Sequence, residues 1–355
     1  MLVYIDNIAS RDNPLKVMKE TIAIYERTLE SRPDNYRDWY RQGNSLRDLG
    51  RFSEALHSYD KALEYEPADY WAWYQRGNLL DGLKRYEEAI ASFDKALEAR
   101  PGDYWAWYEK ACTIKDAGRY EEAIACFDKA LEARPDDYWA WYRRADILRE
   151  GERYEEAMAS YDKALESRPG DFWVWFRRAD VLYEAGQYEE ALKSYQGALA
   201  IKPLNDRCLH MQGKVLDILG QSMEALESLD LAIEQNAENY LCWYDRGIVL
   251  EDLGRISEAA SSYEKAIELN SNHYWSWYQL GNVLTELGFN EDAIAIYTKA
   301  IVCQPDWNKW GSEYASLGSW PWYGKANALR ARGRIEEAQT CLLEALSCER
   351  SAINS

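Results

Sequence analysis

Histidine is scarce in this sequence, and the short motifs that mark catalytic sites are missing from it. The 355 residues include three histidines, His57, His210 and His273, none at a metal-ligand spacing from a cysteine or carboxylate. There is no glycine-rich phosphate loop, no G-x-S-x-G and no H-E-x-x-H. Acid pairs such as Glu121 and Glu122 suit helix starts, where carboxylates favour the helix dipole. We expect no enzyme, no metal and no cofactor.

Positive charge and long apolar runs are also lacking. The chain has 42 Lys and Arg against 61 Asp and Glu, a net charge of -19, which argues against a nucleic-acid partner because phosphate contacts need Lys or Arg. No stretch approaches the roughly 18 apolar residues of a membrane span, so direct membrane insertion is not expected. Seven cysteines without a C-x-x-C pair indicate free thiols. With no secretory signal visible in residues 1–13, the expected location is the cytoplasm.

Phenylalanine is rare among the aromatic residues, whereas tryptophan and tyrosine are abundant. The sequence has 6 Phe but 16 Trp and 27 Tyr. Trp and Tyr carry a polar group and suit half-exposed surfaces, and a purely buried core would use Phe equally well. The excess therefore predicts an aromatic surface.

The sequence repeats itself every 34 residues. Prolines recur at this spacing from Pro33 to Pro203, and YWAWY occurs at 70, 104 and 138. Within each unit, apolar residues recur at helical spacing in two stretches, so each unit is predicted to be a pair of amphipathic helices. A glycine suited to a left-handed helix end separates the two stretches in most units: Gly50, Gly118, Gly186, Gly220, Gly254, Gly288 and Gly333.

These units resemble the tetratricopeptide repeat, with W-x2-x-G/A-x2-L in the first helix and A-x3-Y/F-x2-A and P in the second. The resemblance covers nearly the whole chain. It implies an all-α fold, an alpha-solenoid whose helix-turn-helix repeats form a right-handed superhelix, and a concave groove lined by the first helices. The wording of the repeats is similar to that of cyanobacterial and archaeal arrays.

The pattern predicts five segments. Residues 1–35 form a partial repeat or capping helix, with Asn13 as cap and Pro14 at the first helical position. Residues 36–307 form eight repeats, which begin at 36, 70, 104, 138, 172, 206, 240 and 274. Residues 308–318 are an aromatic insertion loop, residues 319–352 a ninth repeat, and residues 353–355 a tail.

Counting each repeat from its first residue, positions 2, 5 and 9 lie on the helix side opposite the core, which in the family lines the groove. The groove is therefore predicted to carry an aromatic ladder edged by amides and carboxylates. Position 2 is Trp71, Trp105, Trp139, Trp173, Trp275 and Trp320. Position 5 includes Tyr74, Tyr108, Tyr142, Phe176, Tyr244, Tyr278 and Tyr323, and position 9 includes Asn78, Asp146, Asp180, Asn282 and Asn327.

Trp and Tyr concentrate binding energy in protein interfaces, so the ladder favours a protein-protein interaction scaffold that binds a peptide or protein partner. Asparagine at position 9 resembles the family's device for holding a peptide backbone. Packing between neighbouring helices is the alternative role for position 5. Two other functions stay open: an adaptor in assembly of a membrane or photosynthetic complex, and binding of a carbohydrate or small ligand by stacking.

The sixth repeat interrupts the ladder with basic residues. Arg207, His210 and Lys214 replace the groove aromatics and amide there. Either this repeat has drifted, or the three residues form a specificity site for an acidic group of the ligand.

Position 7 is charged in five repeats, although it lies toward the packed side of the helix. It is Arg76, Lys110, Arg144, Arg178 and Arg246, and position 25 of the preceding repeat is Asp60, Asp94, Asp128, Asp162 and Asp230. A charge at such a place needs a partner. We predict ion pairs between neighbouring repeats, with the Glu264 and Leu280 pair as an exception.

The end of the array departs from the pattern. Trp307, Trp310 and Tyr314 crowd the insertion, which is either a cover over exposed core or a second contact surface. The last helix carries Leu342, Leu343 and Leu346 without a polar capping helix after it, so self-association through this helix is a further hypothesis.

Overall fold

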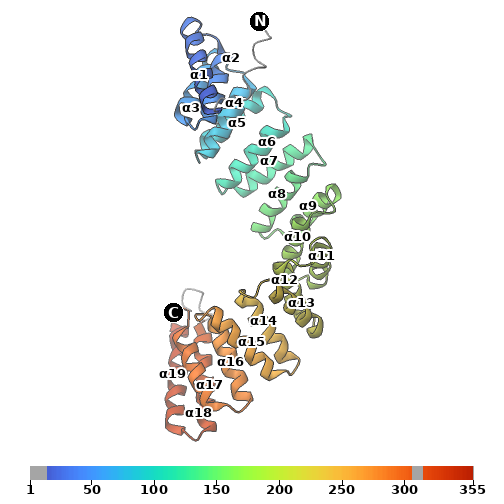
Figure 1. Cartoon of the computed structure of the whole chain (residues 1–355), viewed down its shortest axis with the longest axis vertical. Coiled ribbons are helices and arrows are strands. Elements are labelled where there is room, and N and C mark those ends of the chain that lie inside the picture. Colours follow the sequence, from blue (N-terminus) through green and yellow to red (C-terminus); the bar gives the residue numbers. More distant parts are fainter. Residues whose placement is uncertain (1–13, 306–314, 355) are drawn as a thin grey trace. The chain divides into compact units, whose positions relative to one another are not determined.

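The computed structural model describes residues 14–305 and 315–354, and all regular elements in this part of the chain are helical (Figure 1). The chain divides into two compact units, one ending at Pro169 and one beginning at Gly170. The described helices form an all-α array of helix pairs in which each helix packs against the next in sequence within its unit. The predicted solenoid of repeated helix pairs is therefore confirmed.

The first unit holds nine helices in its described part, starting with a single helix that is followed by four pairs. Their bounds are α1 Pro14–Ser31, α2 Tyr36–Asp48, α3 Phe52–Tyr65, α4 Tyr70–Gly82, α5 Tyr86–Ala99, α6 Tyr104–Asp116, α7 Tyr120–Ala133, α8 Tyr138–Glu150 and α9 Tyr154–Ser167.

The second unit continues the pairs from Phe172. Its described elements are α10 Phe172–Glu184, α11 Tyr188–Ile201, α12 Asp206–Ile218, α13 Ser222–Gln235, α14 Tyr240–Asp252, α15 Ile256–Leu269, α16 Tyr274–Glu286, α17 Asn290–Val302, the 3-10 helix η2 Ala315–Ser319, α18 Trp320–Ala331 and α19 Ile335–Asn354.

The predicted chain ends and the predicted insertion are only partly covered by the helices just given. Asn13, Trp307, Trp310 and Tyr314 lie outside the described residues. The described end of the insertion, from Ala315, is a 3-10 helix, and α19 runs past the predicted repeat end to Asn354.

Local sequence sets where each pair begins and turns. The α8 helix starts after Asp137, whose carboxylate accepts a hydrogen bond from the Ala140 amide at 2.9 Å and caps the helix. The seven separating glycines all have positive φ, between 72° and 84°, as predicted. Lys84 and Glu152 take the corresponding position in two repeats with φ of 59° and 57°, a conformation that costs a residue with a side chain about 1 kcal/mol.

A small residue at position 8 lets the two helices of a pair approach. A Cβ on Gly77 would lie 2.7 Å from the Phe93 ring, and one on Gly247 would lie 2.4 Å from the Tyr263 ring. These rings belong to position 24, which is fully buried in most repeats. The core of most pairs is therefore a large ring placed against a residue with little or no side chain, with Leu229 in place of the ring in the sixth repeat.

Four of the predicted ion pairs between repeats are present. Nitrogen–oxygen distances are 2.8 Å for Arg76 and Asp60, 2.6 Å for Lys110 and Asp94, and 2.7 Å for Arg144 and Asp128. Arg246 and Asp230 are 2.6 Å apart. The cationic side chain is mostly covered and the carboxylate half exposed, so each pair joins a first helix to the second helix of the repeat before it.

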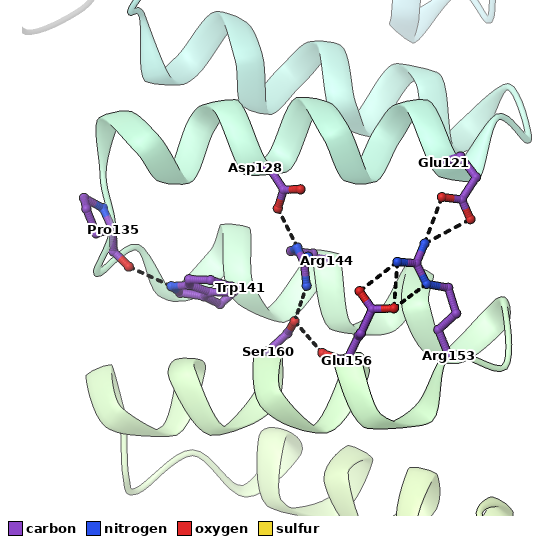
Figure 2. A network of polar contacts seen from close by, with 8 residues as sticks. All are labelled: Glu121, Asp128, Pro135, Trp141, Arg144, Arg153, Glu156 and Ser160. Atoms are coloured by element: carbon purple, nitrogen blue, oxygen red, sulfur yellow. Dashed lines mark hydrogen bonds and ion pairs between the residues drawn. The ribbon is translucent and has the colours of Figure 1, made fainter.

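Each arginine at position 7 also donates a hydrogen bond to a serine in the second helix of its own repeat, a contact that was not predicted from the sequence. Figure 2 shows Arg144 between Asp128 and Ser160, whose hydroxyl accepts from the guanidinium at 2.7 Å and donates to the Glu156 carbonyl at 2.8 Å. The Arg144 guanidinium lies 5.8 Å from the Trp141 ring centre, and the Trp141 indole donates to the Pro135 carbonyl at 2.7 Å. One arginine thus ties together α7, α8 and α9.

The eighth repeat lacks this connection, as the sequence indicated. Leu280 takes the place of the cation, and Ile296 takes the place of the serine. An apolar hollow of about 430 Å³ lies there, lined by Leu280, Phe289 and Ile296, with Glu264 and Asp292 beside them.

Candidate functional site

The tryptophans at position 2 are exposed in four consecutive repeats. Their exposed fractions are 48% for Trp71, 48% for Trp105, 47% for Trp139 and 50% for Trp173. Half of a large ring system therefore faces solvent at the same place in each repeat. Such repeated exposure of tryptophan is typical of a contact surface, because a spacer has no need of it.

The rings beneath these tryptophans hold them in place. Tyr70 is buried and stacks on Tyr74, with ring centres 5.8 Å apart and planes inclined by 16°. Trp71 lies edge-on to both, at 4.9 Å from Tyr70 and 6.2 Å from Tyr74. The same three-ring arrangement recurs around Trp105, Trp139 and Trp173. Position 5 therefore packs within the repeat while remaining partly exposed in most repeats.

A cation from the end of the same repeat covers these rings, which was not predicted. The Arg100 guanidinium lies 4.3 Å from the Tyr70 ring centre and 5.4 Å from that of Trp71. Arg134, Arg168 and Lys202 make the same contacts in the next three repeats. A signal was available, because position 31 is basic in each of these repeats.

The buried tyrosine at position 1 also links neighbouring repeats. The Tyr70 hydroxyl donates to Asp103 at 2.7 Å, and Asp103 caps the next first helix by accepting from the Ala106 amide at 2.9 Å. Burial, together with this hydrogen bond, raises the pKa of Tyr70 far above its ordinary value. The tyrosine stays neutral and serves as a structural hydrogen-bond donor.

Polar residues at position 9 have partners inside their own repeat. The hydroxyls at position 24 donate to them: Tyr161 to Asp146 at 2.6 Å, and Tyr297 to Asn282 at 2.8 Å. Asp180 is buried and accepts from Tyr195 in the same way. Asn78 lies partly exposed on α4, in a repeat where Phe93 occupies position 24. These contacts give position 9 a structural role that the sequence reading had not assigned.

The structure places the three basic residues of the sixth repeat in different surroundings. His210 is buried, and its Nε2 lies 2.6 Å from an Asp245 oxygen, so it does not present a positive group at the surface. Arg207 is exposed and its guanidinium lies 5.1 Å from the ring of Phe176, which is itself buried. Lys214 is partly exposed and lies 5.7 Å from the Tyr183 ring.

Cavities occupy equivalent places between successive first helices. One of about 130 Å³ lies between α6 and α8 and is lined by Cys112, Lys115, Arg143 and Asp146. Another of about 150 Å³ lies between α12 and α14. Each includes residues from positions 9 and 12 of one repeat and from positions 6 and 9 of the next, so the side predicted to be the groove is hollowed at these places.

The third such cavity, between α16 and α18, is the largest of these, at about 560 Å³. Tyr278 and Asn282, both predicted site residues, line it together with Trp320 and Tyr323. Trp275 packs edge-on against Trp320, with ring centres 6.1 Å apart. Tyr244 lies one repeat earlier, 5.9 Å from Tyr263 and 5.0 Å from His273. The structure thus brings the predicted residues of the last two repeats together around one hollow.

The acid-rich cavity between α12 and α14 contains an unusual carboxyl group. Burial, with Asp252 and Asp245 nearby, raises the pKa of Asp217 to about 6. One of its oxygens is buried without a hydrogen-bond partner. In the described part of the chain, no group of three or more His, Cys, Asp or Glu side chains is arranged to hold a metal ion. Among residues 14–305 and 315–354, no helix is long and apolar enough to cross a membrane.

Family models described as tetratricopeptide repeat match most of the chain. The matched residues are 40–104, 108–172, 148–215, 240–273, 262–295 and 321–350. A comparison with curated proteins found no match.

Solved structures share the fold at low sequence identity. The C-terminal part of a TPR repeat-containing protein from Cytophaga hutchinsonii is 15% identical, with a TM-score of 0.57, over 66% of this chain and 96% of that one. A tetratricopeptide repeat protein from Parabacteroides merdae is 18% identical over 70% and 98%, with a TM-score of 0.48. YrrB, described as a TPR protein with an unusual peptide-binding site, is 23% identical over 53% and 97%, with a TM-score of 0.47.

Proposed function

We propose that this chain, which belongs to the tetratricopeptide-repeat family, is a non-catalytic scaffold that binds a peptide segment of a partner protein on the side formed by its first helices. The observation that carries the proposal is the set of four tryptophans exposed by 47% to 50% at the same repeat position. Each is fixed by neighbouring rings and a cation, so little freedom is lost when a partner covers it.

The hollows between first helices support the same side. They lie beside partly exposed tyrosines and amides, and the one between α16 and α18 is large enough for a side chain of a partner. A peptide laid across successive first helices would bury tryptophan against its apolar groups and place single side chains in the hollows. The contact residues proposed from the sequence are accordingly kept, except Phe176, Asp180 and His210, which are buried.

Affinity capture with the whole chain tests this proposal. Trp71, Trp105 and Trp139 are replaced together by alanine, and partners captured from the source cells are compared with those of the unaltered chain. Truncation of a tryptophan at the centre of an interface costs at least about 2 kcal/mol, so binding should weaken by about thirtyfold or more.

The matched control removes three aromatic rings that are exposed elsewhere, on or next to second helices. Phe52, Tyr120 and Phe289 are 42%, 40% and 55% exposed. Their combined replacement by alanine should leave capture unchanged. If the tryptophan variant remains folded by circular dichroism and keeps its partners, the proposal is wrong. The unaltered chain is also tested on a glycan array. If it binds glycans and captures no protein, the ligand is a carbohydrate and not a peptide.

A further inference from the structure

The cavity between α16 and α18 differs from its counterparts in size and in the residue at position 6. At position 6 the counterparts carry Arg143 and Asp245, whose side chains line their cavities. The ninth repeat has Gly324 there. A Cβ on Gly324 would lie 2.5 Å from the Tyr297 ring, so no larger residue fits without moving that ring. This cavity measures about 560 Å³, against about 130 and 150 Å³ in the counterparts.

Aromatic rings at several inclinations form the walls of this cavity. The Tyr278 ring lies 5.8 Å from Trp320 at 42° and 6.3 Å from Tyr297 at 51°. Tyr323 adds a fourth ring, and its hydroxyl donates to Glu349 at 3.1 Å. Several ring faces around one space are the arrangement that attracts a cationic group, because each ring face is electronegative.

The charged lining of this cavity is acidic. Glu286 lines it, together with the polar side chains of Asn282, Thr285 and Asn327, and its lining includes no Lys or Arg. The counterpart cavities mix acids with cations of the chain itself, namely Lys115 and Arg143 in one and Lys214 in the other.

The residue at position 31 also distinguishes the last two repeats from the second to fifth repeats. In four repeats, position 31 is Arg or Lys and covers the rings at positions 1 and 2. In the last two repeats this position is Gln304 and Glu349, neither of which is cationic. Gln304 donates to the Gly318 carbonyl at 2.9 Å instead. The aromatic surface of the last two repeats therefore combines rings and acids without the cation that position 31 supplies in the second to fifth repeats.

We infer that this cavity binds the cationic side chain of a lysine or arginine presented by the partner. This inference rests on the proposed peptide-binding function and adds the chemistry of one bound residue. The ring faces of Tyr278, Trp320 and Tyr323 receive the charged group, and Glu286 pairs with it at the rim. The amides of Asn282 and Asn327 lie where the peptide backbone passes.

Titration of the whole chain with small probes tests the chemistry directly. N-acetyl-arginine amide and N-acetyl-lysine amide are added in the millimolar range, and N-acetyl-citrulline amide serves as the neutral counterpart of arginine. The readout is the Trp320 indole resonance in the NMR spectrum, assigned with Trp320→Phe. We expect both cationic probes to shift this resonance with dissociation constants at least about tenfold lower than that of the citrulline probe. Equal affinity for citrulline would overturn the inference.

A charge-removing variant tests the acid without changing the shape of the cavity. Glu286→Gln should weaken binding of the arginine probe by about three- to tenfold. Glu150→Gln is the matched control, because Glu150 holds the same position in the fourth repeat, and it should leave binding at the α16–α18 cavity unchanged. Unaltered binding by Glu286→Gln, with circular dichroism like that of the unaltered chain, would contradict the inference.

Selection of displayed random peptides separates this inference from the proposed function. Peptides rich in Lys or Arg that lose affinity for Glu286→Gln support both. Peptides that bind and depend on Trp71, Trp105 and Trp139, but show no basic preference and are unaffected by Glu286→Gln, retain the function and overturn the cationic site. If no peptide is selected but the arginine probe still binds, the peptide-binding function fails while the cation specificity stands.

Discussion

The contact between Arg144 and Asp128 should contribute measurably to stability, unlike an ion pair in full contact with solvent. The Arg144 side chain is 15% exposed and its partner 49%, with 2.7 Å between Nε and the carboxylate oxygen. A pair at this depth is worth about 1 kcal/mol, above the typical 0.3 kcal/mol of exposed helix pairs. Loss of the Ser160 hydrogen bond adds about 1 kcal/mol when the guanidinium is removed.

A double-mutant cycle measures the pair itself. The free energy of unfolding is determined by denaturant titration for the unaltered chain, Arg144→Met, Asp128→Asn and the double variant. We expect Arg144→Met to destabilise by about 2 kcal/mol and the coupling energy to be about 1 kcal/mol. The matched cycle uses Lys163 and Glu166, which are 2.8 Å apart but 51% and 65% exposed. Its coupling energy should be about 0.3 kcal/mol. Equal coupling in the two cycles would refute the argument from burial.

Three other outcomes follow from single residues. Lys84→Gly and Glu152→Gly should each stabilise the chain by about 0.5–1 kcal/mol in thermal unfolding, since both residues have positive φ; destabilisation would contradict this reading. The pKa of Asp217 is raised from 3.8 to about 6, so the folded chain binds this proton more tightly and stability falls as pH rises through this window. The free energy of unfolding of Asp217→Asn, relative to that of the unaltered chain, should therefore rise by roughly 1 kcal/mol between pH 4 and pH 7, allowing for solvent screening. A difference between the two chains that does not change with pH would exclude this effect. Trp141→Phe removes the 2.7 Å hydrogen bond to the Pro135 carbonyl and should lower stability by about 1 kcal/mol in the same unfolding assay, whereas an unchanged midpoint would show that the bond contributes nothing.

Much of the fold was predictable because the residues that determine local structure recur at the same positions in successive repeats. The left-handed glycines, the helix pairs and the position 7 ion pairs all follow from residues that recur at fixed spacing. The bond from Arg144 to Ser160 was also visible in principle, since serine stands at position 23 wherever position 7 is arginine. It was not predicted, because position 7 was paired with the acid of the preceding repeat alone.

The candidate site was less predictable, because helix position alone does not give the depth of a side chain. Tyr74 and Phe176 share position 5, yet Phe176 is 1% exposed and has Arg207 over its ring. His210 looked like an exposed base, but Asp245 from the next repeat lies against it. The α16–α18 cavity has Gly324 where its counterparts carry a side chain, and a glycine at this position gives no sign of a site in the sequence.

The arrangement of Asp128, Arg144 and Ser160 has a consequence for how such a chain can grow. The arginine of one repeat takes an acid from the repeat before it and has a serine in its own second helix, so a duplicated copy brings a complete set of partners to both of its junctions. Insertion of a copy of the second, third or fourth repeat beside any of these three therefore creates no orphaned charge. The eighth repeat, with Leu280 and Ile296, cannot be exchanged in this way, because a copy placed after an aspartate would leave that acid facing leucine. Length can thus vary freely in the middle of the array, while its last repeats are fixed in order.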